Sequence, residues 1–307
     1  MADKLKKHFQ YNWQLYLLFL PTFIWIILFV FVPFTTNIIM SLQNYSTTKG
    51  LFHSEFIGLK NYIEFFTMDG FWSLLSNTLL LNLLVLVIGF PAAILLAIMI
   101  YESKSKFIKG LAQTTSFLPF FISAVVVCNM TLEFLKQDTG MIVNILEWFG
   151  VPRQNLINNP SLFRWIYALM ELWQTVGYNS LIYLAALSAI DTSLYEASSI
   201  DGAGKLRQIV YVTLPGIAPT IIITLIMKVG KLLSMGYEKV LLLQTMDNKS
   251  VSEIISTYVY NVSLNPIVGQ PNYGMAATIG LFDAVVAIVL VAVVNAIAKK
   301  VSDTALW

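Results

Sequence analysis

Six long apolar stretches dominate this chain of 307 residues. A bilayer core of about 30 Å is crossed by about 20 residues of helix, because every backbone amide there must be hydrogen-bonded internally. The stretches therefore predict an all-α, polytopic membrane protein, with six transmembrane helices in a single transmembrane domain over residues 1–307. The expected spans are approximately residues 13–40, 72–100, 110–135, 162–190, 216–237 and 273–298.

Two of these spans contain residues that weaken a helix in a membrane. Pro119 lacks a backbone amide and is expected to break the third span. Lys228 and Lys231 interrupt the fifth span with charge. These two spans are the weakest of the six.

The composition excludes several classes of protein. Hydrophobic residues make up 57% of the chain and charged residues only 12%, against about 25% charged residues in soluble domains. The net charge is +2 and the charges are scattered, without the basic, aromatic-rich patch that nucleic acid needs. The single cysteine, Cys128, excludes an internal disulfide and a cysteine-based metal site. Nucleic acid is therefore not an expected partner.

Lysine and arginine indicate which ends of the spans face the cytoplasm. They concentrate in short segments at residues 4–7, 104–109, 205–207 and 299–300, as they do in cytoplasmic loops. With six spans, both termini are expected on the cytoplasmic side of the cytoplasmic membrane. The first apolar run is too long for the apolar region of a signal peptide, so we expect it to remain as an uncleaved span.

The cytoplasmic segment between the fourth and fifth spans, residues 191–215, contains signals for a short helix. Ser193 followed by Glu196 fits a capping box, in which each side chain hydrogen-bonds the other residue's backbone amide. Gly202 and Gly204 are typical of helix ends. An apolar face is formed by residues that recur every three positions, namely Leu194, Ala197 and Ile200. Such a helix either simply joins two spans or offers this face to a groove on a partner protein.

A second helical piece is expected after this short helix, beginning near Lys205. Pro215 and Pro219 suit the first turn of the fifth span, where a missing amide costs little. The sequence thus predicts a break between the second piece and the span.

The order of residues in the 191–215 segment resembles a known motif. Glu196-Ala197-Ser198, Asp201-Gly202-Ala203 and Val212-Thr213-Leu214-Pro215 are similar to the EAA motif of binding-protein-dependent ABC importer permeases, with Ser198 and Val212 as conservative departures. Residues 56–62, Phe-Ile-Gly-Leu-Lys-Asn-Tyr, resemble the F-x-G-L-x-N-Y segment of carbohydrate permeases. The likeness covers essentially the whole chain and is greatest to the MalF-like branch with LplB-type oligosaccharide permeases.

This resemblance implies a type I ABC importer (MetI-like) permease fold and a set of partners. These are a second, MalG-like permease subunit, an ABC ATPase dimer that binds ATP and magnesium, an extracytoplasmic lipoprotein receptor, membrane lipid and an oligosaccharide substrate. The resemblance also implies that the coupling contact with the ATPase is made by Leu194, Tyr195, Glu196, Ala197, Ser198, Ile200, Asp201, Gly202, Ala203 and Gly204.

The chain itself is not expected to be an enzyme or to hold a cofactor. A phosphate-binding loop is not matched, because Leu225 stands where Gly230-Lys231 would need the first glycine. His8 and His53 fall on opposite sides of the membrane in the expected topology, which leaves no catalytic set. ATP hydrolysis is therefore expected from a partner.

Polar residues inside the apolar stretches are candidates for the substrate path, because ionisable groups at membrane depth are costly unless paired or hydrated. Lys228 or Lys231 could instead pair structurally with Asp283, and Trp173 and Tyr178 could belong to an interfacial aromatic belt. The candidates are Asn82, Asn129, Glu133, Glu171, Trp173, Tyr178, Asn179, Lys228, Tyr237, Glu238 and Asp283.

Together these features predict the permease subunit of an ABC importer that translocates an oligosaccharide. The alternative from another class is an ion-coupled secondary transporter or channel. That alternative accounts for Lys228 and Asp283 but not for the spacing of the EAA-like motif.

Overall fold

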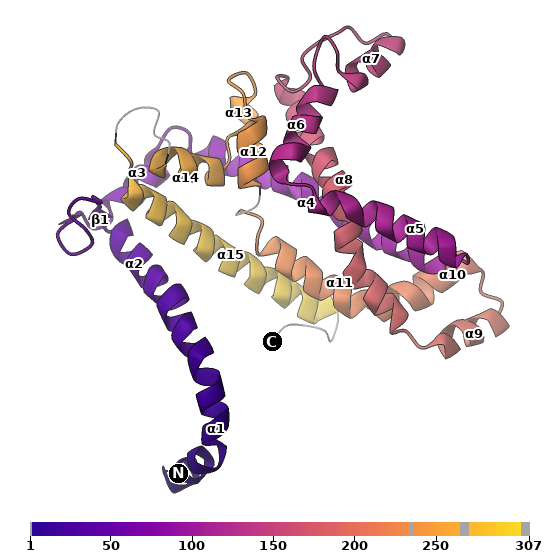
Figure 1. Cartoon of the computed structure of the whole chain (residues 1–307), viewed down its shortest axis with the longest axis horizontal. Helices are drawn as coiled ribbons and strands as arrows, with labels where there is room; N and C mark the ends of the chain where they lie inside the picture. Colours follow the sequence, from indigo (N-terminus) through magenta and orange to yellow (C-terminus); the bar gives the residue numbers. More distant parts are fainter. Residues whose placement is uncertain (1, 234–235, 265–269, 302–307) are drawn as a thin grey trace. The chain divides into compact units, whose positions relative to one another are not determined.

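The computed structural model describes residues 2–233, 236–264 and 270–301. Helices make up most of this part of the chain (Figure 1), and the only strands within it form one two-residue pair. Contacts divide the chain into two units: unit 1 is Met1–Met68 with Val259–Phe282, and unit 2 is Asp69–Tyr258 with Asp283–Trp307.

Unit 1 begins with a long, apolar helical segment. It consists of α1 (Ala2–Ile26), a π turn (Ile27–Phe31) and α2 (Val32–Ser41). The most apolar stretch within Tyr11–Ser41 contains no buried residue. Most of its large apolar side chains are exposed.

A hairpin-like turn follows α2 in unit 1. Strands β1 (Gln43–Asn44) and β2 (Glu55–Phe56) pair antiparallel with Gln43 opposite Phe56. The amide of Asn61, in the carbohydrate-permease-like segment at the start of α3 (Lys60–Thr67), donates to the carbonyls of Ser41 and Gln43 at 2.9 and 3.1 Å. These bonds fix the end of α2 against the loop.

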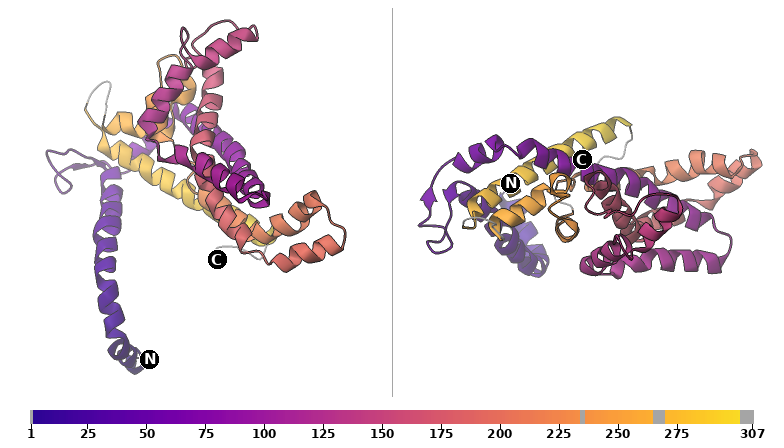
Figure 2. Two further views of the ribbon diagram at one scale, coloured as in Figure 1. Left: turned by 45° about the vertical axis from the view of Figure 1, so that its right-hand side comes forward. Right: turned by 90° about the horizontal axis from the view of Figure 1, so that it is seen from above.

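Unit 2 contains the remaining helices, and its two longest, α4 and α8, pack side by side (Figures 1 and 2). Helices α14 and α15 are divided between the units. The elements after α3 are α4 (Phe71–Glu102), α5 (Lys106–Phe117), a 3-10 turn (Leu118–Phe121), α6 (Ala124–Phe134), α7 (Met141–Trp148), α8 (Pro160–Ser188), α9 (Thr192–Ile200), α10 (Lys205–Gln208), a π turn (Ile209–Thr213), α11 (Leu214–Val229), α12 (Tyr237–Leu243), α13 (Lys249–Ser252), α14 (Ile255–Ser263) and α15 (Tyr273–Val301).

The chain bends sharply at Pro119, as the sequence predicts. The helical segments on either side of the break, Lys106–Phe121 and Ala124–Phe134, meet at 99°. Ser123 caps α6 by accepting a hydrogen bond from the amide of Val126. The Gln174 amide of α8 donates to the Ile122 carbonyl at 2.7 Å, which satisfies a backbone group that the break leaves unpaired.

Six spans were expected, but fewer helices among the described residues are long and apolar enough to cross a membrane. Four segments are long and apolar enough to cross a membrane, and the bent pair could provide a fifth. The remaining predicted span corresponds to α8, a 29-residue helix that carries Arg164 and Glu171. The four segments are Tyr11–Ser41, Phe71–Glu102, Lys205–Val229 and Tyr273–Lys300.

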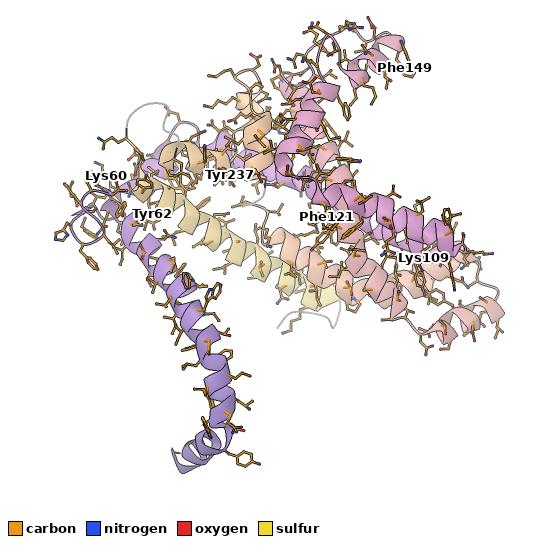
Figure 3. The ribbon with its side chains drawn as sticks, in the orientation of Figure 1. Lys60, Tyr62, Lys109, Phe121, Phe149 and Tyr237 are labelled. Atoms are coloured by element: carbon orange, nitrogen blue, oxygen red, sulfur yellow. The ribbon has the colours of Figure 1, made fainter. Side chains whose placement is uncertain are left out.

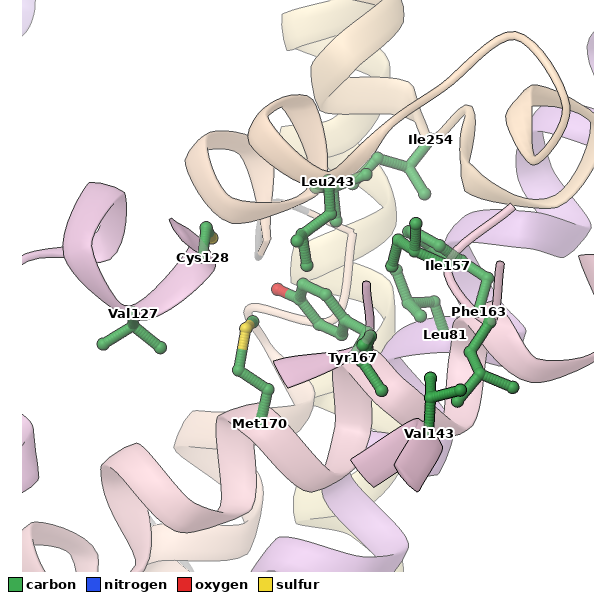
Figure 4. Packing of buried hydrophobic residues seen from close by; sticks show 13 residues of the cluster. Leu81, Val127, Cys128, Val143, Ile157, Phe163, Tyr167, Met170, Leu243 and Ile254 are labelled. Atoms are coloured by element: carbon green, nitrogen blue, oxygen red, sulfur yellow. The ribbon is translucent and has the colours of Figure 1, made fainter. Parts of the chain in front are cut away.

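Two separate clusters of buried apolar residues hold unit 2 together. The first joins Leu81 of α4 and Tyr167 of α8 to Leu243 of α12 and Ile254, as Figure 4 shows. The second joins other parts of the same helices to α11 and includes Ala97, Tyr183, Leu187 and Ile217. Within a bilayer such packing stabilises the fold mainly through van der Waals contacts, because lipid tails are as apolar as these side chains. The stretches of α4 and α8 between the clusters are left free to form a site.

Candidate functional site

The EAA-like segment forms a capped helix, α9, but its cap differs from the predicted one. Asp191, not Ser193, is the N-cap: its Oδ1 accepts a hydrogen bond from the Ser193 amide at 2.9 Å, so α9 begins at Thr192. Ser193 therefore lies inside the first turn, where it cannot form the capping box. Hydrogen bonds from Ser193 hold the pKa of the Asp191 carboxyl below its usual value, because they stabilise the ionised form.

The end of α9 depends on Gly202, as predicted. Gly202 has φ +76°, in the left-handed region. The Ala203 amide donates to the Ser198 carbonyl at 2.9 Å and the Gly202 amide to the Ser199 carbonyl at 3.1 Å. This pair of bonds is the Schellman motif, which needs a left-handed residue at this position. Gly204, by contrast, has φ −69° and does not require glycine for its conformation.

One face of α9 contacts other residues of unit 2. The Tyr195 hydroxyl hydrogen-bonds the Thr213 hydroxyl at 3.1 Å, and the Tyr195 ring lies 6.4 Å from that of Tyr101. The Gln208 amide donates to the hydroxyls of Ser198 and Ser199 at 3.1 and 2.8 Å. These contacts attach α9 to the helical segment that follows it.

The opposite face of α9 carries the predicted apolar stripe and has no cover within the described chain. Leu194 is 53% exposed and Ile200 is 87% exposed. Ala197, between them in the stripe, is exposed as well. Apolar side chains gathered on one exposed face are typical of a surface that binds another protein.

The segment after α9 is one continuous helix over Lys205–Val229, which corrects the predicted break before Pro215. The amide of Leu214, immediately before Pro215, donates to the carbonyl of Ile209 five residues back, so a π turn lets the helix continue past the proline. The helix ends at Val229, short of the predicted boundary at Tyr237. It therefore connects the α9 region directly with Lys228.

A cavity of about 420 Å³ lies between α4, α8 and the end of α11, in the region between the two apolar clusters. Five of the predicted path residues line it: Asn82, Glu171, Tyr178, Asn179 and Lys228. A second cavity of about 580 Å³ shares Tyr178, Asn179, Lys228 and Lys231 with the first. The structure thus brings together residues that are far apart in the sequence.

Lys228 at this cavity does not form the ion pair with Asp283 that the sequence offered as an alternative. The Lys228 ammonium donates to the Asn179 side-chain oxygen at 3.2 Å, and the ion pairs among the described residues include none between Lys228 and Asp283. Glu171 forms an ion pair with Lys239, and both side chains are 16% exposed. Asp283 Oδ1 is buried without a hydrogen-bond partner.

Aromatic rings form part of the cavity wall. The rings of Phe120 and Tyr178 stack with centroids 3.8 Å apart and planes 4° from parallel. Gly177, next to Tyr178, lets α8 pack closely on α5, because a Cβ there would collide with the Ser116 backbone carbonyl. Phe120 was not among the predicted path residues. Phe120 follows directly after Pro119, and a helix break at that proline can turn the next side chain towards α8. This was the signal in the sequence that could have identified Phe120 as a cavity residue.

Six predicted path residues do not line either cavity: Asn129, Glu133, Trp173, Tyr237, Glu238 and Asp283. Glu133 is an exposed partner of Lys136, and Trp173 is 46% exposed. Tyr237 and Glu238 begin α12, where Figure 3 shows Tyr237. Asn82 lines the first cavity, but its amide donates to the Leu232 carbonyl at 2.7 Å. Asn82 therefore braces the backbone beside the cavity.

No cluster of three or more histidine, cysteine, aspartate or glutamate residues suited to a metal ion occurs in the described part of the chain.

Comparisons with known proteins agree with this architecture. Residues 89–303 match the family described as "Binding-protein-dependent transport system inner membrane component". The chain is 40% identical to the polygalacturonan/rhamnogalacturonan transport system permease protein YteP of Bacillus subtilis (strain 168), over 95% of this chain and 90% of YteP. It is 33% identical to protein LplB of the same organism, over 95% of this chain and 91% of LplB.

A solved structure shows the same fold. A chain in the crystal structure of a bacterial alginate ABC transporter, in complex with an alginate pentasaccharide-bound periplasmic protein, matches with a TM-score of 0.89 and 34% identity, over 99% of this chain and all of that one. The family match alone covers more than half of the 307 residues. The chain therefore belongs to the binding-protein-dependent inner-membrane components, the permease subunits of ABC importers.

Proposed function

We propose that this permease carries an oligosaccharide across the cytoplasmic membrane and is driven by a separate ATPase that docks on α9. The observation that carries the docking proposal is the outward apolar stripe of Leu194, Ala197 and Ile200 on a helix capped at both ends. The oligosaccharide is supported by relatives of which one is named for polygalacturonan and another was crystallised as an alginate transporter.

Coupling would pass from α9 to the cavity through a short series of contacts. The Tyr195–Thr213 hydrogen bond and the Gln208 bonds join α9 to the helix Lys205–Val229. A displacement of α9 by the ATPase would therefore move this helix as a body, because a helix is stiff along its axis. Lys228 near its other end would move with it, which changes the shape of the substrate cavity.

The remaining partners follow from the same proposal. A second, MalG-like permease subunit would complete the pathway, the ATPase dimer would bind ATP and magnesium, and a lipid-anchored extracytoplasmic receptor would deliver the sugar. The N- and C-termini and α9 would then face the cytoplasm. In this arrangement residues 1–307 act as one transmembrane domain.

The ion-coupled alternative is less well supported. A buried Asp283 oxygen without a hydrogen-bond partner suits proton coupling. The exposed stripe of α9 has no role in such a transporter, whereas an ATPase partner requires a surface of this kind.

Uptake by the purified, reconstituted complex tests this proposal. Proteoliposomes containing the complex, with the receptor outside, should accumulate a labelled oligosaccharide only when ATP is inside. Collapse of ion gradients with an ionophore should leave uptake unchanged. ATP-independent uptake that the ionophore abolishes would overturn the proposal in favour of ion coupling.

A further inference from the structure

Helix α9 touches the rest of unit 2 along a narrow strip. Tyr195 and Ser198 are the two residues of α9 that are partly buried, and the other residues of the helix are exposed. Ser198 contributes a hydroxyl, which accepts a hydrogen bond from the Gln208 amide. Tyr195 contributes the one aromatic ring of the helix. Tyr195 is therefore the largest side chain that attaches α9 to unit 2.

Tyr195 contacts two different helices. Its hydroxyl hydrogen-bonds the hydroxyl of Thr213, a fully buried residue of the helix Lys205–Val229. Its ring lies beside the ring of Tyr101, with centroids 6.4 Å apart and planes 39° from parallel. Tyr101 stands one residue before the end of α4. The polar end and the ring of one side chain thus reach separate helices.

The Tyr101 ring is itself held in place. It packs against the second apolar cluster, which includes Ala97 of α4 and Leu187 of α8. The ammonium of Lys109, labelled in Figure 3, lies 5.1 Å from the centroid of this ring, within the range of a cation–π contact. A ring held in this way resists displacement, so a movement of Tyr195 acts on α4.

A second contact joins the same end of α4 to the segment after α9. The Lys205 ammonium lies 2.6 Å from a carboxylate oxygen of Glu102, but the Lys205 side chain is 66% exposed. Exposed ion pairs stabilise little, because water and salt screen them. The contact between the Tyr101 and Tyr195 rings is therefore the stronger link between the α9 region and α4.

The two helices that Tyr195 reaches both line the 420 Å³ cavity. Helix α4 contributes Asn82, Leu86 and Phe90, and the helix Lys205–Val229 contributes Lys228. A displacement of α9 that passed through Thr213 alone would move one wall of the cavity. A displacement that also passed through Tyr101 would move two.

We propose that Tyr101 is a positioning residue for transport: it receives the displacement of α9 from the Tyr195 ring and passes it to α4, in parallel with the path through Thr213. Tyr195 thus divides the movement between two walls of the cavity. This inference rests on the proposed docking of an ATPase on α9 and adds a second path from α9 to the cavity.

The amount of sugar moved per ATP hydrolysed in proteoliposomes tests the role of Tyr101. Tyr101→Leu keeps an apolar side chain on the cluster but removes the ring pair, which should lower the ratio of attached to detached α9 about two- to tenfold. The sugar moved per ATP should fall with this ratio. Tyr101→Phe keeps the ring and should transport like the original protein.

A matched pair of lysines on α5 provides a second test outside the apolar cluster. Lys109→Met removes the cation at the Tyr101 ring and should lower the sugar moved per ATP by up to about fivefold. Lys106→Met, at an exposed position three residues earlier, should leave it unchanged. If Tyr101→Leu does not assemble, equal values for the two lysine variants overturn the role of Tyr101 on their own.

Docking is measured separately, by cross-linking the ATPase to a cysteine at Ile200 on the opposite face of α9. The yield should be the same with and without Tyr101→Leu. Unchanged sugar per ATP in Tyr101→Leu, an equal fall in Tyr101→Phe, or a fall accompanied by loss of the cross-link would each overturn the path through Tyr101. Failure of the proposed function is a different result, namely no cross-link and no ATP-driven uptake in the protein with the original Tyr101.

Discussion

The left-handed glycine at the end of α9 allows a sharp test of the docking helix. Gly202 has φ +76°, and a Cβ added there meets no atom within 4 Å. The cost of Gly202→Ala is therefore almost purely backbone strain, about 1–2 kcal/mol for an L-residue in the left-handed region. This cost lowers the equilibrium ratio of folded to frayed α9 by a factor of about 5–30. Gly204→Ala is the matched control, because Gly204 also has open space around it but has φ −69°.

Hydrogen exchange of the peptide 192–203 in the purified complex measures this difference. Gly202→Ala should exchange about 5–30 times faster than the original protein, while Gly204→Ala should exchange at the original rate. Because no residue of α9 is buried, fraying at its end should spread towards the Tyr195 and Gln208 hydrogen bonds that hold the helix. The Gly202 variant should also move less sugar for each ATP hydrolysed. Equal exchange in the two variants would refute the assignment of Gly202 as the essential terminator.

Three further outcomes are expected from other parts of unit 2. Gly177→Ala forces a Cβ against the backbone of α5 and should destabilise the complex by about 1–3 kcal/mol, seen as a lower Tm; Gly110→Ala, in open space in the same helix pair, should not lower it. Lys239→Met leaves the largely buried Glu171 carboxylate without its ion-pair partner and should cost about 3 kcal/mol, whereas adding Glu171→Gln should recover most of that loss. The lowered pKa of the Asp191 carboxyl means that its cap stabilises α9 above the ordinary aspartate pKa of about 3.9 and is lost as pH falls through the lower folded value. The protection of α9 amides, taken relative to their intrinsic exchange rate at each pH, should therefore fall in acid, and Asp191→Asn, which caps without titrating, should abolish that fall; an unchanged acid response in this variant would contradict the cap.

Local signals in the sequence were sufficient for several features of the fold. Pro119 predicted the bend between α5 and α6 because a proline in a helix interior removes a backbone hydrogen bond and weakens the helix at that point. Gly202 predicted the end of α9 because the left-handed conformation selects glycine. These features depend on one residue and its neighbours, so they can be read without the tertiary structure.

Other features depend on choices that sequence leaves open. Asp191 and Ser193 are both good caps, and only the path of the chain selects the first. Pro215 is compatible either with the start of a new helix or with a continuous helix that has a π turn before it. The structure has the π turn. The amide partner of Lys228 and the ring partner of Tyr178 come from helices brought together by packing. Partners distant in sequence carry no local signal.

Cross-linking at α9 tests the central claim most directly. A cysteine at Ile200, which is 87% exposed, is compared with one at Trp148, which is 83% exposed on α7 and lies on the proposed outer side. The native Cys128 is buried and does not compete. With a short bifunctional reagent in native membranes, Ile200→Cys should form an adduct with an ABC ATPase and Trp148→Cys should not. No ATPase adduct at Ile200, or an equal yield at Trp148, would contradict docking at α9.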